Sequence, residues 1–337
     1  MLKGRRQEFQ RNEKLEDLLN ELESILSPVE EKMLEDFETL QFPTLLLIGG
    51  PRTGSTVFMQ WLASLGVFSY PTNLISRFFY APYIGAKIQL LLTDPAYSYK
   101  NEIVDFNGDI TFKSDLGKTA GALAPNDFWY FWRRFIPNAV PRYITEIEER
   151  SIKGEKFIAE IAAIESVFKK PFAMKAMILE QNIPFLSKLF EKAIFINLKR
   201  HPFFNIQSLL EARIKFFGDR NKWYSIRPRQ YHELVKYDPI KQVAGQVYFK
   251  NMAIKEGLSK IDSLQYLEVE YEEYCKNPIS IFRKIEQKYH EYGFIFDWEY
   301  HGPDKFNSAN TVRITAKEKN EIIEAYAEFS GENIDPC

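Results

Sequence analysis

Residues 44–62 read TLLLIGGPRTGSTVFMQWL, and the architecture of the chain follows from this stretch. The run 44–48 is short and apolar, which is typical of a buried strand. Three glycines and Pro51 then indicate a tight loop. Ser55 and Thr56 are suited to cap a following helix. A strand, a glycine loop and a helix N-terminus in this order predict an anion site, because free backbone N–H groups and the helix dipole both favour negative charge there.

The loop nearly fits the nucleotide-phosphate pattern G-x-x-x-x-G-K-[ST]. Gly49 and Gly54 have the required spacing, and Thr56 occupies the position of the metal-binding hydroxyl. Ser55 stands where the pattern needs lysine, and the cation lies instead at Arg52, on the other limb of the loop. Kinases and ATPases use that lysine on the β- and γ-phosphates, so the exchange counts against them. For this stretch alone, a turn that binds nothing is the alternative.

A second stretch, residues 193–210, reads AIFINLKRHPFFNIQSLL. Its apolar start predicts another strand, Arg200 follows the strand end, and Pro202 permits a helix start. Ser208 lies on that expected helix, eight residues after Arg200. Because ligands of open α/β sheets bind beyond the carboxyl ends of the strands, Arg200 and Ser208 can converge on one phosphate group.

These residues resemble the sulfotransferases that use 3′-phosphoadenosine 5′-phosphosulfate (PAPS). PRTGST at 51–56 is similar to their 5′-phosphosulfate loop, in the P-R-[ST]-G-[ST]-T form of the bacterial-type branch. Arg200 and Ser208 resemble their 3′-phosphate motif at the family's spacing. LEVEYEEYCKNPISIFRKI at 267–285 is similar to a later strand-turn-helix element of these enzymes. The resemblance runs from about residue 44 to 285 in the family's order.

The fold that this resemblance implies is α/β, a P-loop-like parallel sheet flanked by helices. A length of 337 residues with 45% hydrophobic residues is enough for a large core. We expect a single sulfotransferase domain over 1–337, with an N-terminal helical segment at 12–40 and an insertion at 70–170 on the acceptor side. Leucines at helical spacing in 12–40, interrupted at Ser27-Pro28, predict a helix pair packed on the domain. The alternatives are a homodimer contact or a cap over the substrate site.

The implied reaction moves a sulfuryl group from PAPS to a hydroxyl, less often an amine, of a small-molecule acceptor. The transfer is in line, needs no metal, and releases 3′-phosphoadenosine 5′-phosphate (PAP). The resemblance assigns the following residues to the donor: Arg52, Thr53, Gly54, Ser55, Thr56, Arg200 and Ser208, with Arg313 reaching the 3′-phosphate from a C-terminal loop.

For catalysis, the resemblance points to Arg52 and to Lys175, which stands where related enzymes have a lysine touching the sulfuryl group. The histidine that follows this lysine by two residues in the cytosolic branch is replaced by Met177, which cannot take a proton. We therefore expect Asp127, before the aromatic run FWYFW, to be the general base. The alternative is that Asp127 caps a helix whose aromatic residues are core. Glu180 is a further base candidate.

The composition limits the classes of partner and compartment that we expect for the chain. A formal net charge of −2 gives no basic excess for nucleic acid. No run approaches the roughly 18 apolar residues of a membrane span. Two cysteines, Cys275 and Cys337, argue against a disulfide framework and favour a cytoplasmic protein.

Two other functions remain as alternatives. One is a phosphotransferase that uses ATP and Mg²⁺ at a degenerate phosphate loop, and Ser55 in the lysine position speaks against it. The other is a nucleotide-binding module without catalysis, which the absence of the catalytic histidine and glutamate of related enzymes keeps open. The identity of the acceptor is not readable from the sequence.

Overall fold

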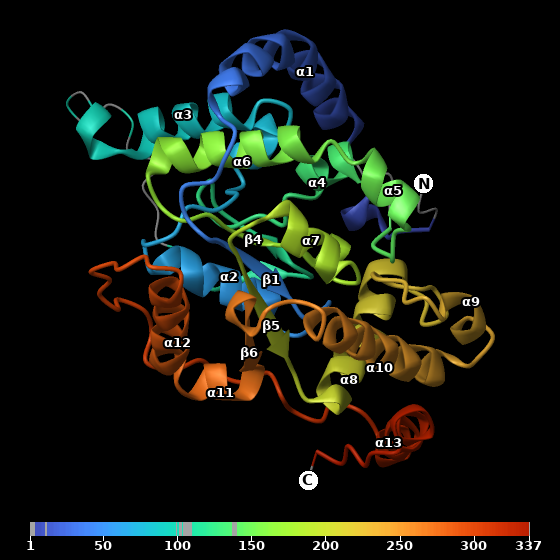
Figure 1. Cartoon of the computed structure of the whole chain (residues 1–337). Helices are drawn as coiled ribbons and strands as arrows, with labels where there is room; N and C mark the ends of the chain where they lie inside the picture. The colour runs from blue at the N-terminus through green and yellow to red at the C-terminus, as the bar shows by residue number, and fades with distance from the viewer. Residues whose placement is uncertain are drawn as a thin grey trace.

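In a computed structural model of the chain, the described residues are 4–10, 12–98, 100, 103, 110–136 and 140–336. Their centre is a sheet of four parallel strands in the order β4-β1-β5-β6, with helices on both of its faces (Figure 1). The strands are β1 (Thr44–Ile48), β4 (Ala173–Lys175), β5 (Ala193–Lys199) and β6 (Tyr266–Glu270). A separate hairpin pairs β2 (Ser114–Asp115) with β3 (Lys118–Thr119).

The helices are α1 (Glu13–Met33), α2 (Ser55–Ser64), α3 (Pro82–Thr93), α4 (Trp129–Phe135), α5 (Glu146–Ser151), α6 (Gly154–Phe168), α7 (Ile183–Leu189), α8 (Pro202–Phe217), α9 (Tyr231–Leu234), α10 (Pro239–Leu258), α11 (Tyr271–Lys276), α12 (Pro278–Glu291) and α13 (Ala316–Ser330). Short 3₁₀ helices lie at Gln7–Phe9, Leu34–Asp36, Ile75–Phe78, Pro95–Tyr97, Met177–Leu179 and Ser263–Gln265.

Alternate residues of the strands feed two cores, because side chains along a strand point to opposite faces. Leu46 and Ile48 pack with residues of α3, α4, α6 and α7 on one face. Leu45 and Leu47 pack with residues of α2, α11 and α12 on the other. All five residues of β1 are buried, as a strand covered on both faces requires.

The parallel order brings the important strand ends together. Leu47 of β1 is in register with Lys175, the last residue of β4, and Ile48 with Asn197 of β5. The glycine loop, Lys175 and Arg200 therefore emerge at the same edge of the sheet. This juxtaposition is the reason why the fold can build one site from three distant stretches.

The predicted fold class is confirmed, together with the strands at 44–48 and 193–198 and the helix start at Pro202. The predicted capping by Ser55 and Thr56 is wrong. Gly54, in a left-handed conformation with φ of 95°, is the N-cap residue, and no side chain caps α2. The two hydroxyl residues already lie in the first turn of the helix.

The predicted break at Ser27-Pro28 is also wrong, since α1 runs through Pro28. Tertiary contacts hold the helix beyond the proline. Glu30, which is buried, accepts hydrogen bonds from the N–H groups of Tyr83 and Ile84 in the first turn of α3 (2.7 and 3.1 Å). The homodimer contact stays a prediction.

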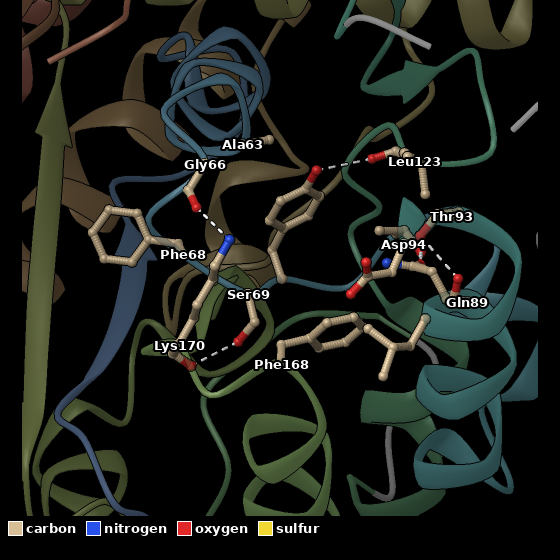
Figure 2. A pocket seen from close by; sticks show the side chains of 13 residues that line it. Ala63, Gly66, Phe68, Ser69, Gln89, Thr93, Asp94, Leu123, Phe168 and Lys170 are labelled. Atoms are coloured by element: carbon tan, nitrogen blue, oxygen red, sulfur yellow. Dashed lines mark hydrogen bonds between the residues drawn. The ribbon is translucent and has the colours of Figure 1, made fainter. Parts of the chain in front are cut away.

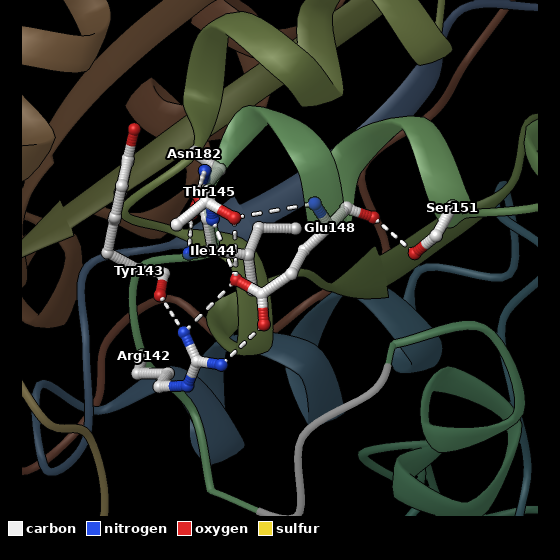
Figure 3. Close-up of polar contacts among 7 residues, drawn as sticks. All are labelled: Arg142, Tyr143, Ile144, Thr145, Glu148, Ser151 and Asn182. Atoms are coloured by element: carbon white, nitrogen blue, oxygen red, sulfur yellow. Dashed lines mark hydrogen bonds and ion pairs between the residues drawn. The ribbon is translucent and has the colours of Figure 1, made fainter.

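The start of α5 anchors the segment before it. Thr145 and Glu148 form a reciprocal capping box, and Glu148 also pairs with Arg142 at 2.5 Å (Figure 3). Asn182, just before α7, bonds both the N–H and the C=O of Ile144 (3.0 and 2.8 Å). These contacts fix 142–148 beside the turn that follows β4.

Among the described residues, no helix combines the length and apolar character needed to cross a bilayer. Cys275 is a buried free thiol, whereas Cys337 lies outside the described residues.

Candidate active site

The loop between β1 and α2 presents free donors. Within the described part of the chain, the backbone N–H groups of residues 52–56 donate no hydrogen bond. Gly49 has a φ of 124°, and a Cβ there would lie 2.1 Å from the backbone oxygen of Leu198, so only glycine fits. The loop is therefore a built cradle of N–H groups at a helix N-terminus, as an anion requires.

Buried side chains hold this loop in place. Thr53 donates its hydroxyl to the Gly50 carbonyl at 2.9 Å, and Asn205 of α8 donates to the Pro51 carbonyl at 2.9 Å. Arg200 donates from Nη1 to the Arg52 carbonyl at 2.8 Å. Thr53 thus offers a ligand its backbone N–H, because its hydroxyl is engaged within the loop.

Three arginines form a cluster at the loop: Arg52 belongs to the loop, and Arg200 and Arg313 lie near it. Arg52 donates from Nε to Ser208 Oγ at 3.0 Å, which links the two predicted donor motifs directly. Arg200 is 9% exposed, and burial is the main factor that lowers its pKa; the charges of Arg52 and Arg313 lower it further. Among the described residues, Arg200 has no carboxylate within ion-pair distance, although the preceding Lys199 pairs with Glu268 at 2.8 Å. The acceptors that Arg200 bonds among the described residues are neutral, although the charge of Glu272 acts on it from farther away. Such a buried guanidinium favours an anionic ligand.

The C-terminal loop closes over Arg200. Asn310 Oδ1 accepts from Arg200 Nε at 2.8 Å, and the Ala309 carbonyl accepts from Arg200 Nη2 at 3.2 Å. Arg313 Nη1 donates to the same carbonyl at 3.2 Å, but its Nε and Nη2 bond Glu211 at 2.9 Å each. Arg313 therefore lies beside the cluster with its charge shared with Glu211, which raises its pKa through those hydrogen bonds.

Two of the three predicted catalytic residues, Lys175 and Asp127, meet in space, whereas Arg52 contacts Ser208. Lys175 Nζ lies 2.6 Å from Asp127 Oδ1 and donates to Thr56 Oγ1 at 3.1 Å. Trp129 Nε1 donates to Asp127 Oδ2 at 3.1 Å. Lys175 is 7% exposed, so this ion pair lies at the inner wall of the site. Through Thr56, the pair is joined to the phosphate loop.

Asp127 does not cap α4. The residue before that helix is Phe128, in a left-handed conformation with φ of 56°, and no side chain caps the helix start. Asn126 holds this conformation by accepting from the Phe128 N–H at 2.8 Å. A non-glycine residue with positive φ is strained, and here the strained turn directs Asp127 toward Lys175.

A small cavity of about 10 Å³ adjoins the ion pair and is lined by Asp127, Trp129, Trp132, Lys175, Met177 and Ile178. The aromatic run is thus divided between two roles. Phe128 and Phe131 stack in the core with centroids 4.4 Å apart, and Trp132 belongs to the same core while also lining the cavity. Trp129 packs against this core and forms the outer wall. Met177, in the place of the related enzymes' histidine, lies at this wall.

Two further residues reach the site without a signal in the sequence. A Cβ on Gly117, in the turn of the β2–β3 hairpin, would lie 3.6 Å from Asp127 Oδ2 and 3.7 Å from Thr56 Oγ1. Burial raises the pKa of Tyr224, and among smaller causes the charge of Arg52 lowers it and those of Asp127 and Asp115 raise it. Both residues come from segments whose sequence indicates only turn or loop.

Glu180 does not reach this cavity. It is fully buried, and its Oε2 accepts from the Gly49 N–H at 3.2 Å beneath the loop. That position excludes Glu180 as the base for an acceptor that enters from solvent.

A larger cavity, of about 280 Å³, lies elsewhere (Figure 2). It borders Ser69 and Lys170, near the amino end of β4, where Ser69 is bridged to Phe172. Lys170 Nζ donates to the Gly66 carbonyl at 2.6 Å, and the Tyr70 hydroxyl donates to the Leu123 carbonyl at 3.1 Å. Its polar groups bond its own walls, and it lies at the opposite end of the sheet from the loop.

Comparison with known proteins identifies the family. The model of a sulfotransferase family matches residues 43–290. No curated protein sequence matches significantly.

Two mycobacterial structures resemble the chain in fold. Sulfotransferase STF9 from Mycobacterium avium has a TM-score of 0.51 at 14% identity, covering 94% of this chain and 84% of its own. Sulfotransferase STF1 from Mycobacterium tuberculosis H37Rv has a TM-score of 0.50 at 9% identity, covering 91% and 81%. With this fold, and with a family match that spans well over half of its residues, the chain belongs to the sulfotransferase family.

Proposed function

We propose that this chain, an enzyme of a transferase family, moves a sulfuryl group from PAPS to a hydroxyl of a small-molecule acceptor and releases PAP. The observation that carries the proposal is the arginine cluster. Among the described residues, buried Arg200 has no carboxylate within ion-pair distance, and it bonds the backbone of Arg52, whose side chain contacts Ser208. Within the same residues, the N–H groups of 52–56 in this loop donate no hydrogen bond. This arrangement offers two anion sites side by side, as a nucleotide with 3′- and 5′-phosphate groups requires.

For the donor, the N–H groups of Arg52 to Thr56 would hold the 5′-phosphosulfate, and Arg52 would add a fork of donors. Arg200 and Ser208 would grip the 3′-phosphate, with the Asn310 loop behind Arg200. Arg313 would contribute mainly by its field, because Glu211 holds its Nε and Nη2. The donor supplies an activated sulfuryl group whose leaving oxygen gains negative charge, and fixed cations and N–H groups stabilise such charge.

At the reacting end, Lys175 would stabilise charge on the sulfuryl oxygens, held there by Thr56 and Asp127. Asp127 would accept the acceptor's proton. Each of its carboxylate oxygens receives one hydrogen bond, from Lys175 or from Trp129, and keeps a further lone pair for the acceptor O–H. Transfer to an amine is a less favoured variant of the same arrangement.

We place the acceptor side in the 70–170 insertion, which supplies Asp127, Trp129, Trp132 and the β2–β3 hairpin. Gln60 of α2 supports the irregular segment before this hairpin by donating to the carbonyls of Thr111 and Lys113 at 2.8 and 3.0 Å. The ATP-dependent alternative is not favoured by the family match. A purely nucleotide-binding role would leave the Lys175–Asp127 pair beside the loop without a purpose.

The test is calorimetric titration with PAP, with adenosine 5′-phosphate and ATP plus Mg²⁺ as controls. We expect a preference for PAP that Arg200→Ala removes. Losing charge-assisted contacts costs about 1.5–3 kcal/mol, or about ten- to a hundredfold in affinity. Arg283→Ala, an exposed arginine paired with Glu286 on α12, is the matched control and should leave PAP binding unchanged. Preferential binding of ATP-Mg²⁺, or equal binding of PAP and adenosine 5′-phosphate, would contradict the proposed donor.

A further inference from the structure

Two buried ionisable side chains hydrogen-bond the backbone of Gly49, the first residue of the phosphate loop. Glu180 Oε2 accepts its N–H at 3.2 Å, and Lys250 Nζ of α10 donates to its carbonyl at 2.7 Å. Glu180 is 0% exposed and Lys250 2% exposed. Both backbone polar groups of Gly49 are therefore satisfied by ionisable side chains from distant parts of the chain.

Such an arrangement lowers the stability of the fold, because buried charges lose their hydration. We therefore look for what the two side chains do in the structure. Burial raises the pKa of Glu180 and lowers that of Lys250, and the attraction between the two groups opposes both shifts. Neither residue lines the cavity beside Asp127 or contacts the arginine cluster. What they share is the backbone at the start of the loop.

The backbone there has an unusual conformation, which is also supported from the Gly50 side by the Thr53 hydroxyl, a donor to the Gly50 carbonyl. Gly49 and Gly50 have φ values of 124° and 86°, outside the range of a strand. A Cβ on Gly50 would lie 2.4 Å from Lys250 Cδ, so the lysine stem packs directly against the loop backbone. Unbonded, the N–H and C=O of Gly49 would be buried polar groups without partners.

The consequence reaches the ligand side of the loop. Glu180 engages the Gly49 N–H and also interacts with the Gly50 N–H, so the loop N–H groups that have no partner among the described residues are those of 52–56. The Lys250 side chain lies directly against Gly49 and Gly50, and the charge of Glu180 offsets that of its ammonium, so the pair acts on the loop through its contacts. Rotation of the Gly49–Gly50 peptide would turn the following N–H groups away from a common centre.

We infer that Glu180 and Lys250 are positioning residues that set the phosphate loop for the 5′-phosphate end of the ligand. The pair acts on the loop backbone and does not touch the reacting atoms. The identity of the ligand rests on the proposed function; the grip on the loop does not.

The experiment compares two nucleotides that differ only at the 5′ end, PAP and adenosine 3′-phosphate. Lys250→Met should weaken PAP binding at least tenfold and change adenosine 3′-phosphate binding less than twofold. Glu180→Leu should have the same selective effect. Glu180→Gln should stay within threefold of wild type, because its amide oxygen can still accept the Gly49 N–H. Lys255→Met, an exposed lysine on the same helix, is the matched control.

Hydrogen exchange of the ligand-free protein gives a second readout. Amides of residues 49–56 should exchange faster in Lys250→Met than in Lys255→Met, with the rest of the sheet unchanged. If the wild-type protein does not prefer PAP over adenosine 5′-phosphate, the proposed donor is wrong. The faster local exchange by itself would still support the role of Glu180 and Lys250 in holding the loop backbone. The inference would be overturned if the variants bind both nucleotides equally less tightly, or if their amides exchange faster uniformly across the protein. It would also be overturned if neither Lys250→Met nor Glu180→Leu folds.

Discussion

The Asp127–Lys175 pair offers a strict test of the site, because its two residues lie 48 positions apart and on different elements. The perturbation is a double-mutant cycle of Lys175→Met, Asp127→Asn and the double variant. Lys175→Met removes the ammonium from its contacts at 2.6 Å with Asp127 and 3.1 Å with Thr56. Met keeps most of the apolar stem volume, so the cavity term stays small.

The magnitude follows from burial and distance. At 2.6 Å and an effective dielectric constant of about 20, the Coulomb attraction is roughly 6 kcal/mol, and desolvation of the 7% exposed lysine cancels most of it. Hydrogen bonds to charged groups retain about 1.5–3 kcal/mol. Since Asp127 is 24% exposed and partly hydrated, we expect a coupling free energy of about 2 kcal/mol.

The assay is urea unfolding of the four proteins, followed by PAP titration and turnover of PAPS with an acceptor found by screening. The double variant should be about 2 kcal/mol more stable than the sum of the single losses predicts. Lys175→Met should lower turnover about 10²- to 10³-fold, the usual cost of one group that stabilises developing charge, while PAP affinity stays within threefold. Additive losses within about 0.5 kcal/mol, or equal losses in turnover and PAP affinity, would refute the reasoning.

Three further predictions concern single residues. Burial raises the pKa of Glu165 from 4.5 to about 7. Its contribution to the free energy of unfolding is therefore fully present below about pH 4.5 and is lost as the pH rises through 7. In urea unfolding, Glu165→Gln should gain about 3 kcal/mol of stability relative to wild type between pH 4.5 and 8, and a pH-independent difference between the two proteins would contradict this. Gly54→Ala combines a φ of 95° with a Cβ 2.5 Å from the Tyr271 ring, and it should destabilise by more than the roughly 1–2 kcal/mol expected of Gly331→Ala, where φ is 72° and the space is open; equal losses on unfolding would show that the clash is relieved. Arg313→Ala should weaken PAP binding by calorimetry less than tenfold, because Glu211 shares its charge, and a larger loss than that of Arg200→Ala would reverse our ranking.

The sequence alone was sufficient where the information is local. An apolar run of five residues, glycines at the points of positive φ, and Arg200 eight residues before Ser208 are short-range patterns, and each one predicts its own piece of structure. The same patterns carried the resemblance to sulfotransferases, which the family match confirmed. Two predictions from local residue preference were wrong. The residues at 55 and 56 lie inside the helix that they were predicted to cap. The helix α1 passes through Pro28, where Glu30 holds it by hydrogen bonds to α3.

Only the tertiary structure decided which side chains meet. Periodicity along the chain does not encode that Asp127 faces Lys175, that Arg52 reaches Ser208, or that Glu211 shares the charge of Arg313. Nor does it show Glu180 and Lys250 on the two sides of Gly49. These pairings arise because four parallel strands bring their carboxyl ends to one edge of the sheet, and contacts across that edge depend on the order and register of strands that are far apart in sequence.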